Sequence, residues 1–413
     1  MERFVPPGSF GRVNAGAYVT CGASPTGAAY CWGDNSMGQL GTGDGASNRV
    51  APVAVPALTG EVVEGFGMGF THGCAVTTAG DAWCWGDNWA GQVGDGTFDT
   101  RMAPVKVDRP AGAEFVDVGA GAIHTCALAA AGDVWCWGDN SLGQLGNGDA
   151  SSAASAVPVR VDAPTGVTFS ALSVGGLHTC ALTASGAAWC WGANDSGQLG
   201  DGSFTTALVP VEVTGVDFSS LGLGLNHACG VSTGGRIHCW GQNFEGQLGD
   251  GTQEGRGTPT PVAGTLVATT VSGGVSHTCA LDADGRAFCW GSGISGRLGT
   301  GTEDMRLTPA AVQSGMMRYS AVDAGAEHTC AIGTDNEAYC WGTNIFGELG
   351  LGVEGGAPSL EPRRVMSPVA PASAHRSSPA TSRRPSATPR GARRPAWCRE
   401  VTPRSAAKIR ICR

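Results

Sequence analysis

The sequence predicts an all-β protein, a seven-bladed β-propeller of four-stranded antiparallel blades. The tripeptide Cys-Trp-Gly occurs seven times at intervals of 49 to 54 residues, with its tryptophan at positions 32, 85, 137, 191, 240, 290 and 341. Glycine is the commonest residue, at 67 of 413, and charged residues make up only 15%. This composition favours turn-rich β-structure, because glycine weakens helices and supplies the positive φ angles of tight turns. A repeat of this length, with four short strands in each copy, is typical of a propeller.

Each copy follows one template, in which four strands can be placed in order. The third copy begins with a β-rich stretch at residues 115–118, which leads into His-Thr-Cys at 124–126. A hairpin follows, and its second strand ends in Cys-Trp-Gly at 136–138. The segment Asn-x-x-Gly-Gln-Leu-Gly-x-Gly then interrupts regular structure. Pro-Val-Arg-Val at 158–161 indicates a short outer strand, because proline is tolerated at a sheet edge.

The template divides the chain into three parts: an N-terminal lead (1–9), the propeller (10–365) and a disordered basic tail (366–413). The seven repeats lie at about 10–60, 61–112, 113–165, 166–215, 216–266, 267–316 and 317–365. The first copy keeps its lead strand, whereas the seventh ends at Pro-Arg-Arg-Val without a following strand. We therefore expect the N-terminal strand to complete the last blade and close the ring, which would remove an exposed sheet edge.

Charge is distributed unevenly along the chain. The last 48 residues hold eleven lysines and arginines against one acid, Glu400, while the first 365 carry 15 basic and 34 acidic side chains. An acidic propeller disfavours nucleic-acid binding through the folded part, and leaves the tail as the segment that could contact anions. The abrupt change in composition favours a second interpretation, an out-of-frame extension in which Cys398 and Cys412 have no role.

Fourteen of the sixteen cysteines form pairs ten residues apart. The pairs are Cys21 with Cys31, Cys74 with Cys84, Cys126 with Cys136, Cys180 with Cys190, Cys229 with Cys239, Cys279 with Cys289, and Cys330 with Cys340. Across a hairpin centred between them, the two members of a pair lie opposite each other, at a separation that a disulfide can span. We expect one intra-blade disulfide in each blade, each contributing at most about 2.8 kcal/mol on chain-entropy grounds.

A metal site is the alternative explanation for the cysteines. Six copies contain His-x-Cys followed by the second cysteine, as in His178, Cys180 and Cys190, and alternation places the histidine and the first cysteine on one strand face. Seven similar metal sites in one ring are disfavoured, and the first copy has Val19 in place of histidine. We expect the histidine to be structural, with a hydrogen bond to loop backbone. No cofactor or metal is therefore predicted.

Recurrence by repeat position assigns most conspicuous residues to structure. Aspartates follow Cys-Trp-Gly at 34, 87 and 139, and Leu-Gly or Val-Gly at 95, 201 and 250, so we interpret them as turn formers. The tryptophan of Cys-Trp-Gly recurs in every copy, which indicates packing. Trp83, Trp135 and Trp189 lie two residues before it in three of the copies. Clustered tryptophans are what a photoreceptor would need, but alternate positions on a strand explain these three equally well.

The two variable residues inside Asn-x-x-Gly carry more information about binding. Around the ring they are Ser36-Met37, Trp89-Ala90, Ser141-Leu142, Asp195-Ser196, Phe244-Glu245, Ile294-Ser295 and Ile345-Phe346. Large apolar side chains on surface loops are typical anchors of protein interfaces. We predict that Trp89, Phe244, Ile345 and Phe346 contact a partner protein; packing between blades is the alternative.

The pattern Gly-x-x-His-Thr-x-Ala-Leu followed by Trp-Gly-x-Asn-x-x-Gly-Gln-Leu-Gly resembles the regulator of chromosome condensation repeat family, over about residues 10–365. The resemblance implies a seven-bladed propeller, which agrees with the strand assignment. Family members include a nucleotide exchange factor, a photoreceptor and bacterial inhibitors of hydrolases, so the fold leaves the function open. This chain departs from typical members by its paired cysteines, as a bacterial-type variant would. It also has Gly293 where the template has asparagine.

Paired cysteines predict an extracellular, periplasmic or cell-surface location, although the N-terminus shows no signal peptide, as an incorrectly assigned start codon would explain. The sequence contains no phosphate-binding loop, Gly-x-Ser-x-Gly or His-Glu-x-x-His motif. We therefore predict a non-enzymatic scaffold that binds a protein partner through loops on one propeller face. The alternative is a regulator: an inhibitor of a secreted hydrolase, or a guanine-nucleotide exchange factor, which the cysteines oppose.

Overall fold

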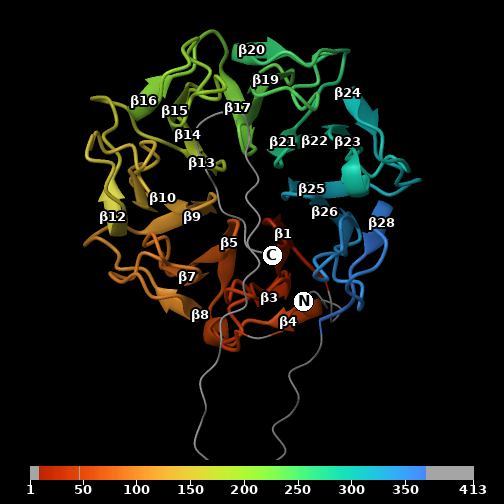
Figure 1. The fold of residues 1–413 in the computed structure, drawn as a ribbon, viewed down its shortest axis with the longest axis horizontal. Coiled ribbons are helices and arrows are strands. Elements are labelled where there is room, and N and C mark those ends of the chain that lie inside the picture. The colour runs from red at the N-terminus through yellow and green to blue at the C-terminus, as the bar shows by residue number, and fades with distance from the viewer. Residues whose placement is uncertain (1–8, 46, 369–413) are drawn as a thin grey trace, which may run out of the picture. The chain divides into compact units, whose positions relative to one another are not determined.

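A computed structural model describes residues 9–45 and 47–368 as seven four-stranded sheets arranged in a ring (Figure 1). In each sheet the strands are hydrogen-bonded in chain order, and every pairing is antiparallel. The predicted fold class is therefore confirmed. The predicted tail lies outside the described residues from 369 onward, and so do Cys398 and Cys412.

The four strands of a blade run from the central channel to the rim. The innermost strands are β1 (Arg12–Ala15), β5 (Val63–Met68), β9 (Phe115–Ala120), β13 (Ala171–Val174), β17 (Phe218–Leu223), β21 (Thr270–Gly273) and β25 (Tyr319–Ala324). The second strands are β2 (Val19–Ala23), β6 (His72–Thr77), β10 (His124–Ala129), β14 (His178–Leu182), β18 (His227–Ser232), β22 (His277–Leu281) and β26 (His328–Gly333).

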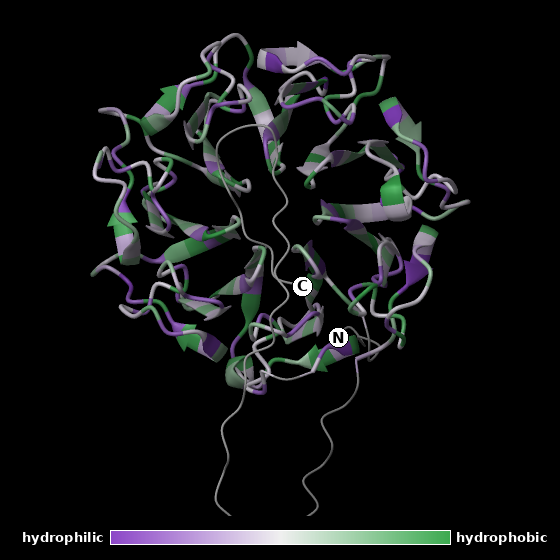
Figure 2. Cartoon of the chain, viewed as in Figure 1, coloured by the Kyte–Doolittle hydropathy of each residue, from purple (hydrophilic) through white to green (hydrophobic). Residues whose placement is uncertain are grey.

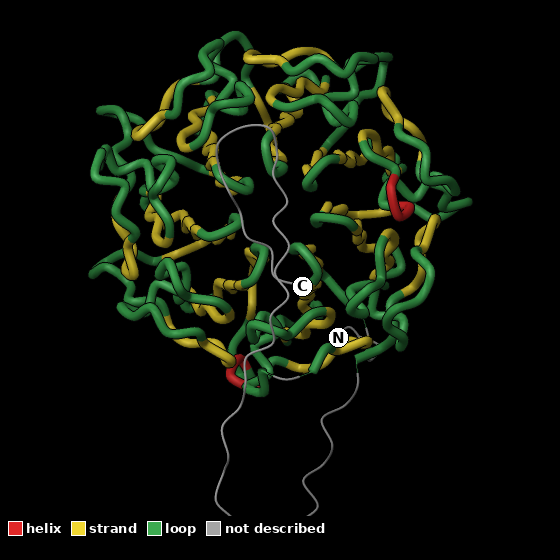
Figure 3. Tube along the Cα trace, in the orientation of Figure 1, coloured by secondary structure: helices red, strands yellow, loops and turns green. Residues whose placement is uncertain are grey.

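The third strand of each blade ends in Cys-Trp-Gly, and the fourth lies at the rim. The third strands are β3 (Ala29–Gly33), β7 (Ala82–Gly86), β11 (Val134–Gly138), β15 (Ala188–Gly192), β19 (Ile237–Gly241), β23 (Ala287–Gly291) and β27 (Ala338–Gly342). The outer strands are β4 (Arg49–Ala54), β8 (Arg101–Lys106), β12 (Ser155–Arg160), β16 (Ala207–Glu212), β20 (Arg256–Pro261), β24 (Arg306–Ala311) and β28 (Ser359–Arg364). Two short 3-10 turns, η1 (Pro56–Leu58) and η2 (Ile294–Gly296), are the helical segments drawn in Figure 3.

Register follows from the cysteine spacing, as predicted, because the two cysteines of each blade pair directly across its second and third strands. Each pair forms a disulfide whose Cα atoms are 4.0 or 4.1 Å apart. The seven disulfides join Cys21 to Cys31, Cys74 to Cys84, Cys126 to Cys136, Cys180 to Cys190, Cys229 to Cys239, Cys279 to Cys289, and Cys330 to Cys340.

The predicted set of one intra-blade disulfide in each blade is therefore confirmed. Because both cysteines of every pair are bonded to each other, the alternative metal site loses its thiolate ligands. The bridges are compatible with an extracellular location.

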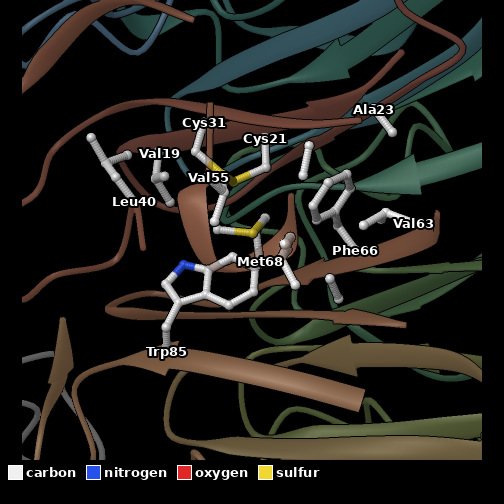
Figure 4. Close-up of a cluster of buried hydrophobic side chains, with 13 residues drawn as sticks. Val19, Cys21, Ala23, Cys31, Leu40, Val55, Val63, Phe66, Met68 and Trp85 are labelled. Carbon is white, nitrogen blue, oxygen red and sulfur yellow. A yellow bond between two sulfur atoms is a disulfide. The ribbon is translucent and has the colours of Figure 1, made fainter. Parts of the chain in front are cut away.

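The hydrophobic core lies between blades rather than in one layer, and hydrophobic residues are spread round the whole ring (Figure 2). Seven separate clusters of buried residues fill the seven boundaries between adjacent blades. At the boundary of blades 1 and 2, Trp85 packs over the Cys21–Cys31 disulfide, Val19 and Leu40 (Figure 4). All seven Cys-Trp-Gly tryptophans are fully buried, which confirms their packing role.

The ring closes differently from the prediction. β1 pairs with β2 of its own blade, and β28 remains the outer strand of blade 7, so no strand of the described sheets is exchanged. Closure uses the contacts found at other boundaries: the Trp32 indole N–H donates to Glu348 O at 2.9 Å, and Phe10 packs in the cluster of blade 7. The prediction was wrong because a complete blade 1 can satisfy its own strands and still bury its face against blade 7.

Glycine at the turn between the first two strands allows neighbouring blades to approach. The position is glycine in all seven blades: Gly16, Gly69, Gly121, Gly175, Gly224, Gly274 and Gly325. A Cβ atom on Gly121 would lie 2.5 Å from Gly175 O and 2.6 Å from Nδ1 of the His124 ring. At the closing boundary, the Ala326 N–H donates to Gly16 O at 3.0 Å. A side chain at this position would therefore separate adjacent blades.

A polar network reinforces the closing boundary inside the central channel, a cavity of about 350 Å³ lined by the innermost strands. The half-buried Asp323 carboxylate accepts hydrogen bonds from Asn14 Nδ2 at 2.9 Å, from the Ala15 N–H at 2.7 Å and from Ser272 Oγ at 2.9 Å. Asn14 Oδ1 in turn accepts from the Met68 N–H at 2.8 Å. The network thus joins blades 6, 7, 1 and 2.

Candidate interaction surface

The loops between third and outer strands lie at the same end of the ring as the turns between the first two strands, because His72 pairs with Gly86. We call this end the loop face. Its loops are residues 34–45 with 47–48, 87–100, 139–154, 193–206, 242–255, 292–305 and 343–358. Within the described part of the chain, no helical segment has the length and apolar character needed to cross a membrane.

The asparagine and glutamine of the loop motif are buried in the blades that have them, and they hold the loop backbone. In blade 2, Asn88 Oδ1 accepts from the Val93 N–H at 2.9 Å, and Asn88 Nδ2 donates to the carbonyls of Thr97 and Asp99 at 3.0 Å. Gln92 Oε1 accepts from the Ala90 N–H at 2.9 Å. These hydrogen bonds pair the backbone N–H and C=O groups of the buried part of the loop. The variable residues are therefore attached to a backbone of fixed conformation.

The first variable residue of Asn-x-x-Gly is exposed in all seven blades. Trp89 is 61% exposed, Phe244 70%, Ile294 58% and Ile345 50%. Packing between blades, the alternative explanation, does not account for side chains with this much accessible surface. Three of the four predicted partner-binding residues therefore lie where a partner could reach them, and their role stays a prediction.

The second variable residue is less exposed in most blades and, in blade 7, packs on the neighbouring blade. Phe346 is half-buried, and its ring lies 5.3 Å from that of Tyr18 in an edge-on arrangement. Ala90 is fully buried. The geometry of Phe346 thus favours packing at the boundary of blades 7 and 1, where its removal would affect stability.

The structure adds exposed apolar residues that the sequence prediction omitted. Phe98 and Phe204 lie two residues after the last glycine of their loop motif, and Met305 and Val353 lie in the corresponding loops of blades 6 and 7. All four are exposed. The residues of blades 5 and 6 equivalent to the two phenylalanines are Gln253 and Glu303, and this polar substitution pattern was the signal that the position faces solvent.

Beneath the loops, a repeated hydrogen-bond relay joins adjacent blades. Thr125 Oγ1 donates to Gln92 O at 2.8 Å and lies 2.9 Å from His72 Nε2. The same carbonyl accepts from the Trp137 indole N–H at 2.9 Å. Because a carbonyl can only accept, the threonine hydroxyl gives its proton to Gln92 O, and His72 must donate from Nε2. The predicted backbone partner of the histidine was wrong: its partner is the threonine hydroxyl of the next blade.

Burial keeps these histidines neutral. It lowers the pKa of His72, His124, His178 and His328 to about 3 and that of His227 to about 4, and it also lowers the pKa of His277. Their Nδ1 atoms have no hydrogen-bond partner among the described residues. A second proton on the ring would thus occupy a dry site without an acceptor, so the folded protein strongly favours the neutral imidazole.

Blades 6 and 7 replace the loop glutamine by charged residues, Arg297 and Glu348. Both are buried, and Glu348 accepts from the N–H groups of Ile345 at 3.2 Å and Phe346 at 2.7 Å. Burial, together with a smaller effect of the Glu327 charge, raises the pKa of Glu348 to about 7 despite these bonds. Glu348 therefore supports the loop that presents Ile345.

The aspartates of the loops act as predicted. Asp34, Asp95 and Asp250 each accept a hydrogen bond from the backbone N–H two residues later, at 3.0, 3.1 and 2.9 Å. Such Asx-type bonds fix turns. Trp83, Trp135 and Trp189 pack against the boundary clusters of their blades, which supports the strand-alternation explanation.

The fold and the loop face define a class of protein, a closed β-propeller that presents variable residues from rigid, hydrogen-bonded loops. Within this class the chain belongs to the RCC1-like domain family, which matches residues 29–378; the regulator of chromosome condensation (RCC1) repeat matches residues 12–39. The family predicted from the repeat is thereby confirmed.

Comparisons with individual proteins locate the chain within a diverse family. It is 36% identical to the ultraviolet-B receptor UVR8 of Arabidopsis thaliana over 199 residues, which cover 46% of this chain and 44% of the receptor. The chain covers less than half the length of the curated relatives it matches first. These partial matches support common ancestry of the repeats. The activity of each whole relative is a property of that relative alone.

Two solved structures share the fold. Prp20p of Saccharomyces cerevisiae, described with its binding to Gsp1p and histones, superimposes with a TM-score of 0.74 at 22% identity and covers 87% of each chain. The ectodomain of the Physcomitrella patens receptor kinase CR4 gives a TM-score of 0.52 at 21% identity, over 81% of this chain and 74% of the ectodomain. At these identities the likeness concerns the fold alone.

Proposed function

We propose that this chain is a non-enzymatic scaffold that binds a protein partner through its loop face, outside the reducing cytosol. The observation that carries the proposal is the exposure of Trp89, Phe244 and Ile345 on loops whose stems are fixed by internal hydrogen bonds. A preorganised loop loses little conformational entropy on binding, and a bulky apolar side chain supplies contact area. Prp20p, which has the same fold, is described as binding proteins.

Alanine substitution tests the loop face. We expect Phe244→Ala and Trp89→Ala to leave the melting temperature within about 2 °C of the parent, because exposed side chains contribute little to stability. The same variants should lose the partner that the oxidised parent captures, identified by mass spectrometry. Phe346→Ala is the matched control, since its ring packs on Tyr18 and its loss should lower the melting temperature. Retained capture by both loop variants would contradict the proposal.

The proposed compartment rests on the seven disulfides, because such bonds persist in oxidising environments. The CR4 ectodomain offers a precedent for this fold outside the cell. Thiol titration of the denatured, unreduced protein should find the fourteen propeller cysteines blocked. Reactive thiols at these fourteen cysteines in air-handled protein would overturn the proposed location.

Inhibition of a secreted hydrolase is a second candidate function, favoured over nucleotide exchange by the disulfides. An inhibitor would use the same loop face, with an apolar anchor that occupies the hydrolase cleft. If the captured partner is a hydrolase, its steady-state rate should fall on addition of the parent and recover with Phe244→Ala. A captured hydrolase with an unchanged rate would assign the scaffold function alone.

A further inference from the structure

We propose that the loops of blades 5, 6 and 7 bind a cationic segment of the partner protein, one that alternates lysine or arginine with bulky apolar side chains. We call the apolar part of this region the blade 5–7 surface: Phe244, Ile294, Met305, Ile345 and Val353, all exposed. The inference deepens the proposed function and rests on it, because the surface is part of the loop face.

The first variable residue divides the ring into two kinds of blade. It is polar in blades 1, 3 and 4, as Ser36, Ser141 and Asp195, and large and apolar in the other four. Among these, Phe244, Ile294 and Ile345 occur on consecutive blades, whereas Trp89 stands between two serine-bearing neighbours. Three consecutive blades thus present a large apolar residue at this position, and Trp89 provides a comparison on a blade whose two neighbours carry serine there.

Contacts join the loops of blades 5, 6 and 7, and at the boundary of blades 6 and 7 a Cβ on Gly296 would lie 2.7 Å from the Leu360 side chain. Gln253 Nε2 donates to Phe244 O at 2.7 Å and reaches Met305 Sδ of the next blade at 3.7 Å. The glycine that follows the variable residues lies against the outer strand of the next blade, so that a Cβ on Gly246 would meet the Leu307 side chain at 2.5 Å. Each loop of this region thus rests on its neighbour, and the exposed residues share one support.

The rim of the surface is acidic. The loop segments 242–256, 291–306 and 342–358 contain seven acidic residues against three arginines. The side chains of Glu254 and Asp304 are 79% and 70% exposed, and Glu303 and Glu354 are exposed as well.

The three arginines offset this rim only in part, because seven acidic residues outnumber them. Arg297 is buried, and Arg256 donates to the buried Asp250 carboxylate at 2.9 Å, while its Nη1 lies 3.5 Å from the exposed Glu254. Arg306 Nη2 lies 3.7 Å from Asp304, at the surface. The exposed carboxylates therefore leave a negative potential around an apolar centre.

An apolar centre with an acidic rim is complementary to one kind of ligand. Long lysine and arginine side chains can lay their aliphatic stems on apolar residues and place the charged group over the rim. Acidic segments would be repelled, and neutral apolar segments would gain nothing from the rim. Because the carboxylates are exposed, the attraction should weaken as salt shortens the Debye length from about 10 Å to about 3 Å.

The test uses the oxidised full chain and a fluorescent synthetic peptide in which lysine and leucine alternate, with glutamate–leucine and lysine–serine versions as controls. We expect the lysine–leucine peptide to bind best. The double variants Phe244→Ala/Ile345→Ala and Glu254→Lys/Asp304→Lys should each weaken its binding about tenfold, a loss of about 1.4 kcal/mol. Trp89→Ala and Asp99→Lys, the equivalent changes on blade 2, should change it less than about twofold.

Each outcome has a distinct meaning. Equal weakening by the blade 2 variants would assign binding to the acidic propeller as a whole and overturn the inference, as would tighter binding of the glutamate–leucine peptide. No binding of the lysine–leucine peptide, with partner capture still dependent on Phe244, would overturn the inference and leave the proposed function standing. Capture that ignores Phe244 would remove the proposed function itself. Unchanged melting temperatures exclude unfolding as the cause of any loss.

Discussion

Two boundaries between blades lack the histidine–threonine hydrogen bond, and they lack it in different ways. Between blades 1 and 2, Val19 replaces the histidine and Gly73 replaces the threonine. Met68 occupies the freed space, since a Cβ on Gly73 would lie 2.6 Å from its Cε. Between blades 4 and 5, His178 is retained and Ala228 replaces the threonine. Both ring nitrogens of His178 are buried without a partner in the described part of the chain.

Losing both partners of a buried hydrogen bond and losing one of them have different free-energy costs. Replacing both partners of a buried hydrogen bond by apolar groups that pack well is nearly neutral, whereas removing one partner leaves a desolvated polar group that costs about 1–3 kcal/mol. The boundary of blades 1 and 2 is therefore compensated, and that of blades 4 and 5 is a local weak point. The other five boundaries keep the intact pair, as at His328 and Thr20, 2.8 Å apart.

Acidification should produce the largest effect, because it acts on every boundary that contains a histidine. A histidine whose pKa is lower in the folded than in the unfolded state stabilises the fold above about pH 6.5. That stability is lost as pH falls from 6.5 toward about 3, the folded pKa of His72, His124, His178 and His328. Asp323 and Glu348, whose pKa values rise to about 6 and about 7, act in the opposite direction but are outnumbered.

We therefore expect the free energy of unfolding to fall by several kcal/mol between about pH 7 and about pH 5, measured by denaturant titration without reductant. Amide exchange should show protection lost first around the histidine-bearing boundaries, while the Val19–Gly73 boundary keeps its protection. A flat pH profile would show that the histidines are not held neutral, and the comparison of boundaries would lose its basis.

Thr125→Val should give the next largest effect, because it converts an intact boundary into one resembling that of blades 4 and 5. It leaves His72 Nε2 without an acceptor and removes one of the two bonds to Gln92 O. The expected loss is about 2 kcal/mol of unfolding free energy, measured by denaturant titration. Thr100→Val, at an exposed loop position, is the control for the substitution itself. An unchanged midpoint would mean that the relay contributes no net stability.

Ala228→Thr should sharpen the comparison from the other side, with a gain of about 1 kcal/mol. The new hydroxyl would face His178 Nε2 and could donate to Gln198 O, which already accepts from the Trp240 indole N–H at 2.9 Å. Ala228→Val fills a similar volume without a hydroxyl and serves as the control in thermal melts. A gain shared by both variants would assign the effect to filling space and contradict the hydrogen-bond explanation.

The sequence predicted the blades because its signals act within one repeat. Cysteines ten residues apart specify a hairpin and its register, and Pro158 in the third copy indicates an outer strand. The histidine's partner could not be predicted in the same way. His72 and Thr125 are 53 residues apart and meet only when two blades pack. The prediction that the N-terminal strand completes the last blade was wrong for the same reason. The sequence does not specify whether β1 pairs within its own blade or with the last one.

The candidate surface was predicted in part. The variable residues of Asn-x-x-Gly identified the loops, because positions that vary between otherwise similar repeats are not required for the fold of the blade. The sequence could not tell that the first of the two faces solvent while the second, as at Phe346, packs on a neighbour, because the irregular backbone has no periodicity from which to infer direction. Phe346 rests on Tyr18, which lies at the other end of the chain and becomes its neighbour only through ring closure.

His178→Val should change the free energy of unfolding the least, and the sign of that change tests the comparison most directly. It removes both unpaired nitrogens and makes the boundary of blades 4 and 5 resemble the compensated one, so the free energy of unfolding should stay within about 0.5 kcal/mol of the parent or rise. The identical change at an intact boundary, His124→Val, leaves the Thr179 hydroxyl without its histidine partner and should cost about 2 kcal/mol. Equal losses would show that histidine stabilises both boundaries by packing alone. Opposite signs would show that the stability of a blade boundary depends on whether its two polar residues are lost together or one at a time.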